Sequence, residues 1–292
     1  MKKNRPSATS SLVARGLLLV AETPEWAPVL IAGSVARTKE FLTPAEGSHW
    51  LDVVQETHLG RAVLRRLERI LSPGILLHWA LRKRVFDAVA QNALEAGCEQ
   101  VVILGAGLDT LGWRLCNRVM CFELDHPATQ ALKRNLPSAG PHLIAIDLGQ
   151  VSAAQALLAH SAFRANSRTL FVAEGLLMYL PPDRVAGLFR ELAQVAAPGS
   201  RIVFSFMEDR PGFPLSFHNA SGWIGKWLSR KQEPFLWGLQ PSAVPAFLQQ
   251  DGWEMDALTT TADFRQLLAP FGLEKEPLAI GEPVVTAHTP LQ

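Results

Sequence analysis

The strongest chemical signal in the chain is a glycine turn that directly follows a short apolar run. Residues 101–104 (VVIL) lead into Gly105 and Gly107. Glycines are needed where a backbone turns tightly and a ligand approaches it closely. Asp125 ends the next apolar run, 20 residues after Gly105, which is the spacing of a carboxylate that binds ribose hydroxyls. The pattern predicts a nucleoside site at the end of a strand.

The glycine pattern distinguishes between two kinds of nucleoside cofactor. A dinucleotide site has a third glycine in G-x-G-x-x-G, but here that position is Thr110, and Gly112 comes two residues later. The third glycine allows close packing of helix on strand in dinucleotide sites, so its absence argues against NAD. S-adenosylmethionine carries a ribose and an adenine without phosphate, and a glycine turn with an acidic strand end suffices for it. A purely structural glycine turn is the alternative.

Two later apolar runs also end in an acid. Asp147 is followed by Leu148, a pair suited to the amine and the ring face of adenine, and Glu174 ends the next run. Each alone is more commonly a helix cap or a loop acid. Together with Glu123 and Asp125 they place four acids at strand ends, where doubly wound sheets bind their ligands.

The elements that would position these residues begin at Gln100, where short apolar runs alternate with helical stretches. This alternation is typical of βα units on a parallel sheet. The predicted strands are Gln100–Leu104, Val119–Glu123, His142–Ile146, Thr169–Ala173 and Arg201–Phe206. The predicted helices between them are Ala128–Asn135, Ala153–His160 and Asp183–Ala196. The fold class is therefore α/β, a doubly wound Rossmann-like sheet.

The remaining segments flank this core, residues 97–206, within one predicted domain, residues 1–292. Residues 1–96 predict a helical cap with helices Ser11–Glu22, Trp50–Leu71 and Ile75–Ala96, and the arginines of the second helix predict a solvated face. Residues 207–240, rich in Pro, Gly and aromatics, predict a lid. Residues 241–292 complete the sheet: a helix Pro241–Gln250, a strand through Leu258, and an apolar run Ala279–Ala287 that pairs at the sheet edge.

Composition limits the partners and the compartment. The chain has 292 residues, 48% of them apolar, and a net charge of +1. Such a balance does not favour nucleic acid, and no run of 18 apolar residues predicts a membrane span. Arg15 interrupts the apolar stretch near the N-terminus, which argues against a secretion signal. Three cysteines without metal-site spacing fit a cytoplasmic protein with no metal. We expect a small-molecule acceptor, with neither nucleic acid nor membrane as partner; the oligomeric state stays open.

Five blocks carry a resemblance to a known family. They are LRKRVFD (81–87), LGAGLDTLGWRL (104–115), FELDHP (122–127), AEGLLMYLPP (173–182) and APGSRIVF (197–204). In this order they resemble the leucine carboxyl methyltransferase-like group of class I S-adenosylmethionine-dependent methyltransferases. GAGLDT and EGLLMYL are far more specific than a lone GxG. The first 80 residues and residues 208–238, which shape the acceptor pocket, do not match closely.

The resemblance implies S-adenosyl-L-methionine as cofactor and a role for each matching position. Arg82 would pair with the methionine carboxylate of the cofactor, with Arg84 as the alternative register. Glu174 would face the methionyl amine or the reaction chamber. The other implied contacts are Gly105 and Gly107 under the methionyl and ribose portion, Asp125 on the ribose with support from Glu123, and Asp147 with Leu148 at the adenine.

The implied reaction is an in-line methyl transfer, for which the protein mainly aligns the nucleophile, the methyl group and the sulfur. Tyr179 could orient the acceptor, and Arg37, with Lys39 beside it, could hold an acceptor carboxylate. A carboxylate needs no general base, whereas a hydroxyl does. The candidate bases are the strand-end carboxylates and His49, His58, His78, His126 and His218. Only His126 lies within the family blocks, which favours a carboxylate acceptor.

The aromatic residues of the lid segment, which are Phe213, Phe217, Trp223, Trp227, Phe235 and Trp237, favour an apolar acceptor. The predicted function is therefore O-methylation of a carboxylate or hydroxyl of a small, largely apolar metabolite such as a natural-product intermediate. A protein C-terminal carboxylate is the alternative acceptor. Two other classes stay open: an NAD(P)-dependent oxidoreductase, although no lysine follows Tyr179 by four residues, and a non-catalytic nucleoside-binding subunit.

Overall fold

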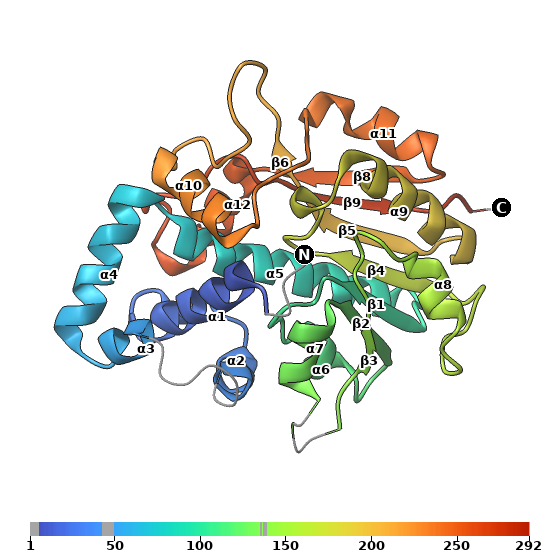
Figure 1. The fold of residues 1–292 in the computed structure, drawn as a ribbon, viewed down its shortest axis with the longest axis horizontal. Coiled ribbons are helices and arrows are strands. Elements are labelled where there is room, and N and C mark those ends of the chain that lie inside the picture. Colours follow the sequence, from blue (N-terminus) through green and yellow to red (C-terminus); the bar gives the residue numbers. More distant parts are fainter. Residues whose placement is uncertain (1–5, 43–49, 135, 137–138, 292) are drawn as a thin grey trace.

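The computed structural model describes residues 6–42, 50–134, 136 and 139–291. A seven-stranded sheet runs through it in the order β3-β2-β1-β4-β5-β9-β8 (Figure 1). Its strands are β1 (Gln100–Leu104), β2 (Met120–Asp125), β3 (His142–Ala145), β4 (Thr169–Ala173), β5 (Arg201–Ser205), β8 (Glu254–Thr259) and β9 (Val284–His288). The first five are parallel, and β9 runs antiparallel to both of its neighbours. The predicted α/β class with a doubly wound sheet is confirmed.

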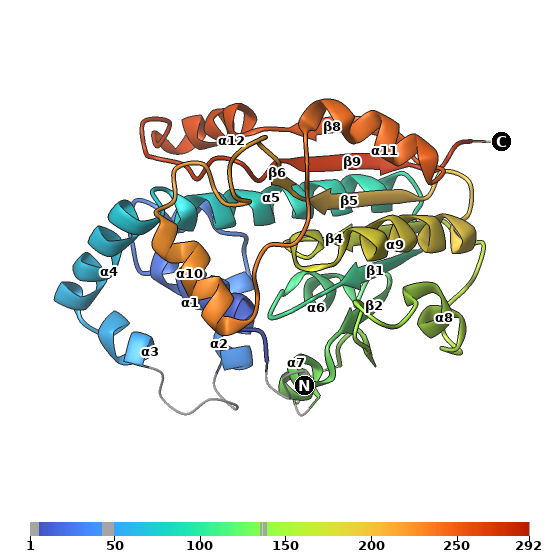
Figure 2. The ribbon, with the colours of Figure 1, turned by 45° about the horizontal axis from the view of Figure 1, so that its top comes forward.

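Helices cover both faces of the sheet (Figure 2). The helices before β1 are α1 (Ala8–Ala21), α2 (Ser34–Leu42), α3 (Trp50–Gln55), α4 (His58–Leu71) and α5 (Ile75–Glu95). The later ones are α6 (Leu111–Leu115), α7 (Pro127–Lys133), α8 (Ala153–Leu158), α9 (Pro182–Val195), α10 (Gly222–Lys231), α11 (Val244–Gln250) and α12 (Thr261–Leu268). Short 3-10 turns lie at Ala27–Val29, Leu177–Tyr179, Pro241–Ala243 and Ala269–Phe271, and β6 (Met207–Glu208) pairs with β7 (Gly238–Leu239).

The central strands β1 and β4 are apolar after their first residue because both of their faces are buried. In β1, Val101 and Ile103 join a core with α1, α5 and α12, whereas Val102 and Leu104 join a second core with α8, α9 and α11. Every residue of β1 and β4 is buried. Parallel strands buried on both faces read as continuous apolar runs rather than as alternating ones, which is why these strands could be predicted closely.

One predicted helix of the N-terminal cap differs from the structure. The predicted helix Trp50–Leu71 is two helices, because Thr57 begins α4 as its N-cap and accepts from the Gly60 N–H at 3.0 Å. A threonine side chain that binds the free N–H of a first turn favours a helix start at that point. The predicted end of another helix, Asn135, lies outside the described residues.

The C-terminal strands also differ from the prediction. The run Ala279–Ala287 does not pair at the sheet edge, because β9 lies between β5 and β8, and β8 forms the edge. The apolar residues Val284, Val285 and Ala287 are buried, as an interior strand requires, whereas most of β8 is exposed. Its exposed residues include the charged Glu254 and Asp256, which suit an edge strand. The helices α2, α6, α10 and α12 were not predicted.

The strand order reverses between β1 and β4, since β2 and β3 lie on one side of them and β5 on the other. Ligands of open α/β sheets bind in the crevice at such a point, outside the carboxyl ends of the strands. The helices α1 and α10 lie over this end of the sheet (Figure 2). The topology therefore places the predicted strand-end acids and the glycine turn at one covered edge.

Candidate active site

A cavity of about 1310 Å³ opens at this edge of the sheet. Residues 103–109 form part of its lining, with Asp125, Asp147 and Glu174 from the neighbouring strand ends. The opposite walls come from α1, from α4 and from α10. A site for one drug-sized ligand measures roughly 300–1,000 Å³, so this cavity has room for a nucleoside cofactor and a second molecule.

The glycine loop, residues 105–109, needs its glycines for two reasons. Gly105 and Gly107 have φ angles of +61° and +51°, a region that other residues rarely adopt. A Cβ atom at Gly107 would lie only 2.4 Å from the Ser10 hydroxyl oxygen of α1. That hydroxyl accepts from the Leu108 N–H at 2.7 Å, so α1 packs directly on the loop.

Asp125 ends β2 beside the glycine loop, as predicted. Its carboxylate accepts from the Gly107 N–H and, at 2.6 Å, from the His126 N–H. Burial raises the pKa of Asp125 although these two N–H groups oppose the shift. Asp147 also lines the cavity, and its Oδ1 accepts from the Gly149 N–H at 3.0 Å. The acids at the carboxyl ends of β2 and β3 therefore both line the cavity.

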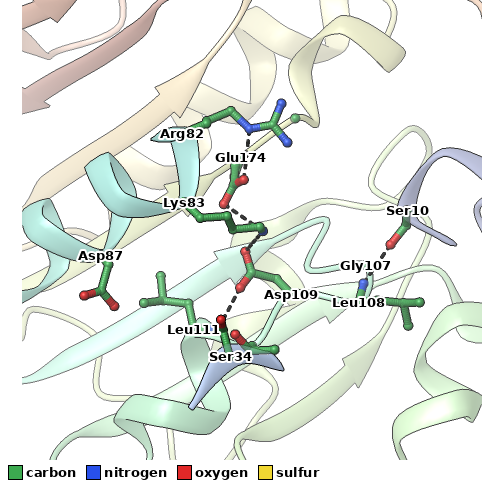
Figure 3. A network of polar contacts seen from close by, with 12 residues as sticks. Ser10, Ser34, Arg82, Lys83, Asp87, Gly107, Leu108, Asp109, Leu111 and Glu174 are labelled. Atoms are coloured by element: carbon green, nitrogen blue, oxygen red, sulfur yellow. Dashed lines mark hydrogen bonds and ion pairs between the residues drawn. The ribbon is translucent and has the colours of Figure 1, made fainter. Parts of the chain in front are cut away.

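A chain of buried ion pairs crosses from α5 to the end of β4 (Figure 3). Arg82 Nε donates to Glu174 at 2.9 Å, and Lys83 Nζ donates to the other oxygen of Glu174 at 3.1 Å. Lys83 also pairs with Asp109 of the glycine loop. Burial by itself would raise the pKa of Asp109, but Lys83 lowers it below the usual range. The ion pairs fix α5 to the loop and to β4.

A second acid, Glu282, binds Arg82 from the C-terminal part of the chain. Arg82 Nη1 donates to both oxygens of Glu282, at 2.6 and 2.7 Å, and His78 Nε2 lies 2.8 Å from Glu282. Ser205 donates its hydroxyl to the same carboxylate at 2.8 Å. Burial would raise the pKa of Glu282, but Arg82 and His78 hold it at about 2. These contacts use Nε and Nη1 of Arg82 and leave Nη2 beside Gly175.

The structure separates the two registers considered for the arginine. Arg82 lines the cavity, whereas Arg84 donates to the Val29 carbonyl at 3.1 Å and stacks on Phe271. Glu123, completely buried, lies behind the loop and pairs with Lys133 at 2.7 Å. Burial raises the pKa of Glu123 to about 7 although Lys133 opposes the shift.

Three other residues predicted from the sequence to bind cofactor or acceptor lie outside the cavity lining. Leu148 packs into the core beneath α8 and α9 and is absent from the cavity lining. Arg37 lies on α2, where it pairs with Glu40 and stacks on Trp113, also outside the lining. Neither residue is brought to the cavity. Lys39 is exposed and lies 3.9 Å from Glu22.

Tyr179 does line the cavity, and its ring packs on Phe235 at 5.4 Å between centroids. Burial raises the pKa of Tyr179 although the Thr9 side chain opposes the shift, so its hydroxyl stays protonated at neutral pH. His126 is the one candidate histidine among the described residues that lines the cavity, and its Nδ1 accepts from the Ala128 N–H at 3.3 Å. His49 lies outside the described residues.

The lid segment supplies part of the apolar wall. Of its six aromatics, the lining includes Phe217, Trp223, Trp227 and Phe235, while Phe213 is exposed and Trp237 joins the core. After α10, Glu233 turns back to the start of α1. Its carboxylate accepts from the N–H groups of Ala8 and Thr9, both at 2.9 Å, and from the Thr9 hydroxyl at 2.6 Å. Glu233 therefore ties the segment after α10 to the start of α1, and residues of both line the cavity.

Sequence reasoning missed four polar residues of the site. Lys83 and Asp109 lie within the blocks LRKRVFD and GAGLDT, so their positions were available although no role was assigned. Glu282 is the only acid in the apolar run Ala279–Ala287, which is a usable signal because a lone charge in a buried strand region needs a partner. Glu233 gave no signal, because its helix partner is more than 200 residues away.

The residues at the cavity suit S-adenosyl-L-methionine. Asp125 offers a carboxylate at a strand end next to glycine backbone, where a ribose can approach. At the β4 end, Arg82 lines the cavity with its Nη2 beside Gly175, and a guanidinium can bind a carboxylate. Glu174 supplies negative charge near the same point for an ammonium group. Asp125 therefore suits the ribose, while Arg82 and Glu174 suit the carboxylate and the ammonium group of the methionyl end.

Comparison with known proteins agrees with this geometry. The family model of leucine carboxyl methyltransferase matches residues 21–193. YktD of Bacillus subtilis, named as an S-adenosyl-L-methionine-dependent methyltransferase, is 32% identical over 232 residues, 72% of this chain and 73% of YktD. A Mycobacterium marinum protein named in the same way is 32% identical over 191 residues, 61% of this chain and 62% of that protein.

A solved structure supports the fold alone. It comes from Thermobifida fusca, is described as a methyltransferase, and superposes with a TM-score of 0.56 at 17% identity, covering 82% of this chain and 93% of that one. The matching family model spans more than half of the chain. The chain therefore belongs to the leucine carboxyl methyltransferase family of S-adenosyl-L-methionine-dependent methyltransferases, as its motifs predicted.

Proposed function

We propose that this chain is an O-methyltransferase whose acceptor is a small, largely apolar molecule with a carboxylate as the receiving group. The observation that carries the proposal is the wall of the cavity beyond the glycine loop. It is built from Leu64, Leu67 and Leu71 of α4 and from Trp223, Trp227 and Phe217 on the opposite side. Such a wall excludes water and favours a hydrophobic acceptor.

Among the described residues that line the cavity, the histidine and two of the acids are already engaged, which supports a carboxylate acceptor over a hydroxyl. His126, which lines the cavity, spends Nδ1 on the start of α7. The acids Asp109 and Glu174 are held by Lys83. A carboxylate acceptor is already ionised at neutral pH and needs no proton removed. The protonated hydroxyl of Tyr179 can donate to one acceptor oxygen while the other attacks.

The bound cofactor supplies a methyl group on a positively charged sulfur, which is the electrophile. The chain then has to hold the acceptor oxygen in line with that methyl group and keep water out. Asp125 and Arg82 would fix the two ends of the cofactor, and α1 closes the cavity through Ser10. Because alignment supplies most of the effect, no single side chain has to carry out the transfer.

The deciding experiment offers methyl-labelled S-adenosylmethionine with apolar carboxylic acids and with the alcohols of the same carbon skeleton. We expect label on the acids, in a form that mild base releases, because methyl esters hydrolyse and ethers do not. Label only on the alcohols would contradict a carboxylate acceptor. Label only on peptides with a free C-terminal carboxylate would contradict a small-molecule acceptor.

The cofactor contacts are tested separately with two variants, Asp125→Ala and the isosteric Asp125→Asn. Loss of two charge-assisted hydrogen bonds to ribose is expected to weaken S-adenosylhomocysteine binding about 100-fold, measured by calorimetry. Thermal unfolding should show that both variants stay folded. Unchanged binding by either variant would remove the ribose role from Asp125, and wild-type binding of NAD in place of S-adenosylhomocysteine would contradict the proposed cofactor contacts as a whole.

A further inference from the structure

The helix α4 is amphipathic, yet none of its residues is buried. Its apolar side chains recur at three- and four-residue spacing, and the exposed fractions are 77% for Leu59, 47% for Val63, 43% for Leu67 and 61% for Ile70. An exposed apolar stripe of this kind marks an interaction surface in a protein that otherwise buries such residues. The stripe is continuous with the cavity, because Leu67 lines the cavity as well.

The helix α10 extends the same surface on the other side of the cavity mouth. Its Trp223 is 64% exposed and also lines the cavity. The two helices meet where the Ser221 N–H donates to the Leu71 carbonyl at 2.8 Å, and they diverge from that joint (Figure 2). The rim of the cavity is therefore apolar along both helices.

The two helices of this rim carry a net positive charge, although Arg69 of α4 pairs with Glu276 at 3.5 Å. The helix α4 carries four arginines and one glutamate, and α10 carries one arginine, two lysines and no acid. The whole chain has a net charge of only +1, so the rest of the molecule is acidic and the excess of cations is concentrated here. Helices with a leucine- or tryptophan-rich face flanked by arginine and lysine lie in the interface of anionic membranes.

We propose that the α4–α10 rim docks onto an anionic lipid bilayer, with Leu59, Ile70 and Trp223 entering the headgroup region. This is peripheral binding: within the described residues no helix has the length and apolar character to cross a bilayer. The expectation of no membrane partner rested on the net charge of the chain and on the lack of a spanning segment. Neither criterion can detect a local apolar and cationic surface such as that of α4 and α10. Under the proposed function, docking would place the cavity mouth at the bilayer, where apolar acceptors dissolve.

The test is co-sedimentation of the full chain with vesicles of phosphatidylcholine alone and with vesicles containing about one third phosphatidylglycerol. We expect binding to the anionic vesicles only, weakened as salt is raised. The variant Arg66→Gln/Lys226→Gln should lower the partition coefficient about 25-fold, at roughly fivefold per cation. The variant Leu59→Gln/Ile70→Gln should abolish binding. None of these four residues lines the cavity.

Matched controls lie away from the rim: Leu158→Gln removes a 56% exposed leucine of α8, and Arg134→Gln removes an exposed arginine after α7. Both should sediment with anionic vesicles as the wild type does. Equal binding by the rim variants, or no binding by the wild type, would overturn the proposal. A dimer seen by light scattering that only Leu59→Gln/Ile70→Gln dissociates, without vesicle binding, would assign the surface to a second copy. S-adenosylhomocysteine titration of the same variants reports separately on the cofactor site.

Discussion

At the scale of single residues, Arg82 joins the cofactor end of the cavity to the C-terminal part of the chain. Two of its nitrogens hold Glu174 and Glu282, and the third is left for the cavity. A buried pair that loses one partner leaves the other as an uncompensated charge. Arg82 is therefore both structural and available to the cofactor, whereas the resemblance assigned it only the second role.

We predict that Arg82→Ala lowers the free energy of unfolding by about 3–5 kcal/mol, since Glu282 loses its cation. It should also abolish S-adenosylhomocysteine binding, and Arg82→Lys keeps a folded variant for the same titration. Urea unfolding and calorimetry measure the two effects. Arg84→Ala and the surface variant Arg69→Ala should bind normally. If Arg84→Ala loses binding to the same degree, the register assigned to these arginines is wrong.

The glycine loop gives a second prediction at the residue scale, with its control in the same chain. Gly107 and Gly33 both have positive φ, +51° and +78°, but a Cβ at Gly33 meets nothing within 4 Å. Alanine at either position should cost about 1–2 kcal/mol of stability through the backbone. Only Gly107→Ala should push α1 away through Ser10 and weaken S-adenosylhomocysteine binding. Equal affinities of the two variants would show that the close approach of α1 is not needed.

At the scale of elements, the lid and α1 act as one unit through Glu233. The first turn of α1 contains no acid of its own, and the Glu233 carboxylate takes the place of one by accepting from two of its N–H groups. Such caps contribute about 0.5–2 kcal/mol to the helix they begin. A stabilisation of that size keeps the start of α1 in place and still allows it to open.

Glu233→Ala is therefore expected to raise amide hydrogen exchange in residues 8–12 about tenfold, with only a small change in the global unfolding temperature. S-adenosylhomocysteine should dissociate faster, because α1 no longer closes the cavity. Stopped-flow and exchange mass spectrometry measure these effects, with the exposed Glu254→Ala as control. A variant that exchanges like the wild type would mean that α1 is held by Ser10 and its core contacts alone.

At the scale of the whole molecule, two buried glutamates set the pH dependence of stability: the pKa of Glu123 is raised above its usual value, and the pKa of Glu282 is lowered. Burial holds the pKa of Glu123 at about 7, so the folded state keeps a proton that the unfolded chain has released above pH 4.5. Stability should therefore fall as pH rises from about 4.5 to 7. The pKa of Glu282 is about 2, so its contribution is lost as pH falls from about 4.5 toward 2.

We expect the free energy of unfolding in urea, followed by tryptophan fluorescence, to be greatest near pH 5. It should decline by up to about 1.4 kcal/mol per pH unit toward pH 7. Glu123→Gln should lower the overall stability, because Lys133 loses its partner, and it should flatten this decline. The same slope in the variant and the wild type would assign the pH dependence to other groups.

The sequence by itself determined the five parallel strands of the sheet, the glycine loop and the family. The strands Gln100–Leu104 and Thr169–Ala173 are continuous apolar runs after their first residue, and a strand end followed by Gly105 and Gly107 is a local pattern. Local patterns fix backbone conformation and the order of elements along the chain. For the same reason the placement of Asp125, Asp147 and Glu174 at one edge could be predicted, since parallel strands end together.

Only the tertiary structure decided which distant side chains complete the site. Glu282 reaches Arg82 because β9 inserts beside β5, and Glu233 reaches α1 because the lid folds back. Arg37 and Leu148 do not line the cavity, although both lie within residues 21–193, which match the family model. Contacts between residues far apart in sequence depend on how whole elements pack. A buried charge also has no periodic sequence pattern from which it could be predicted.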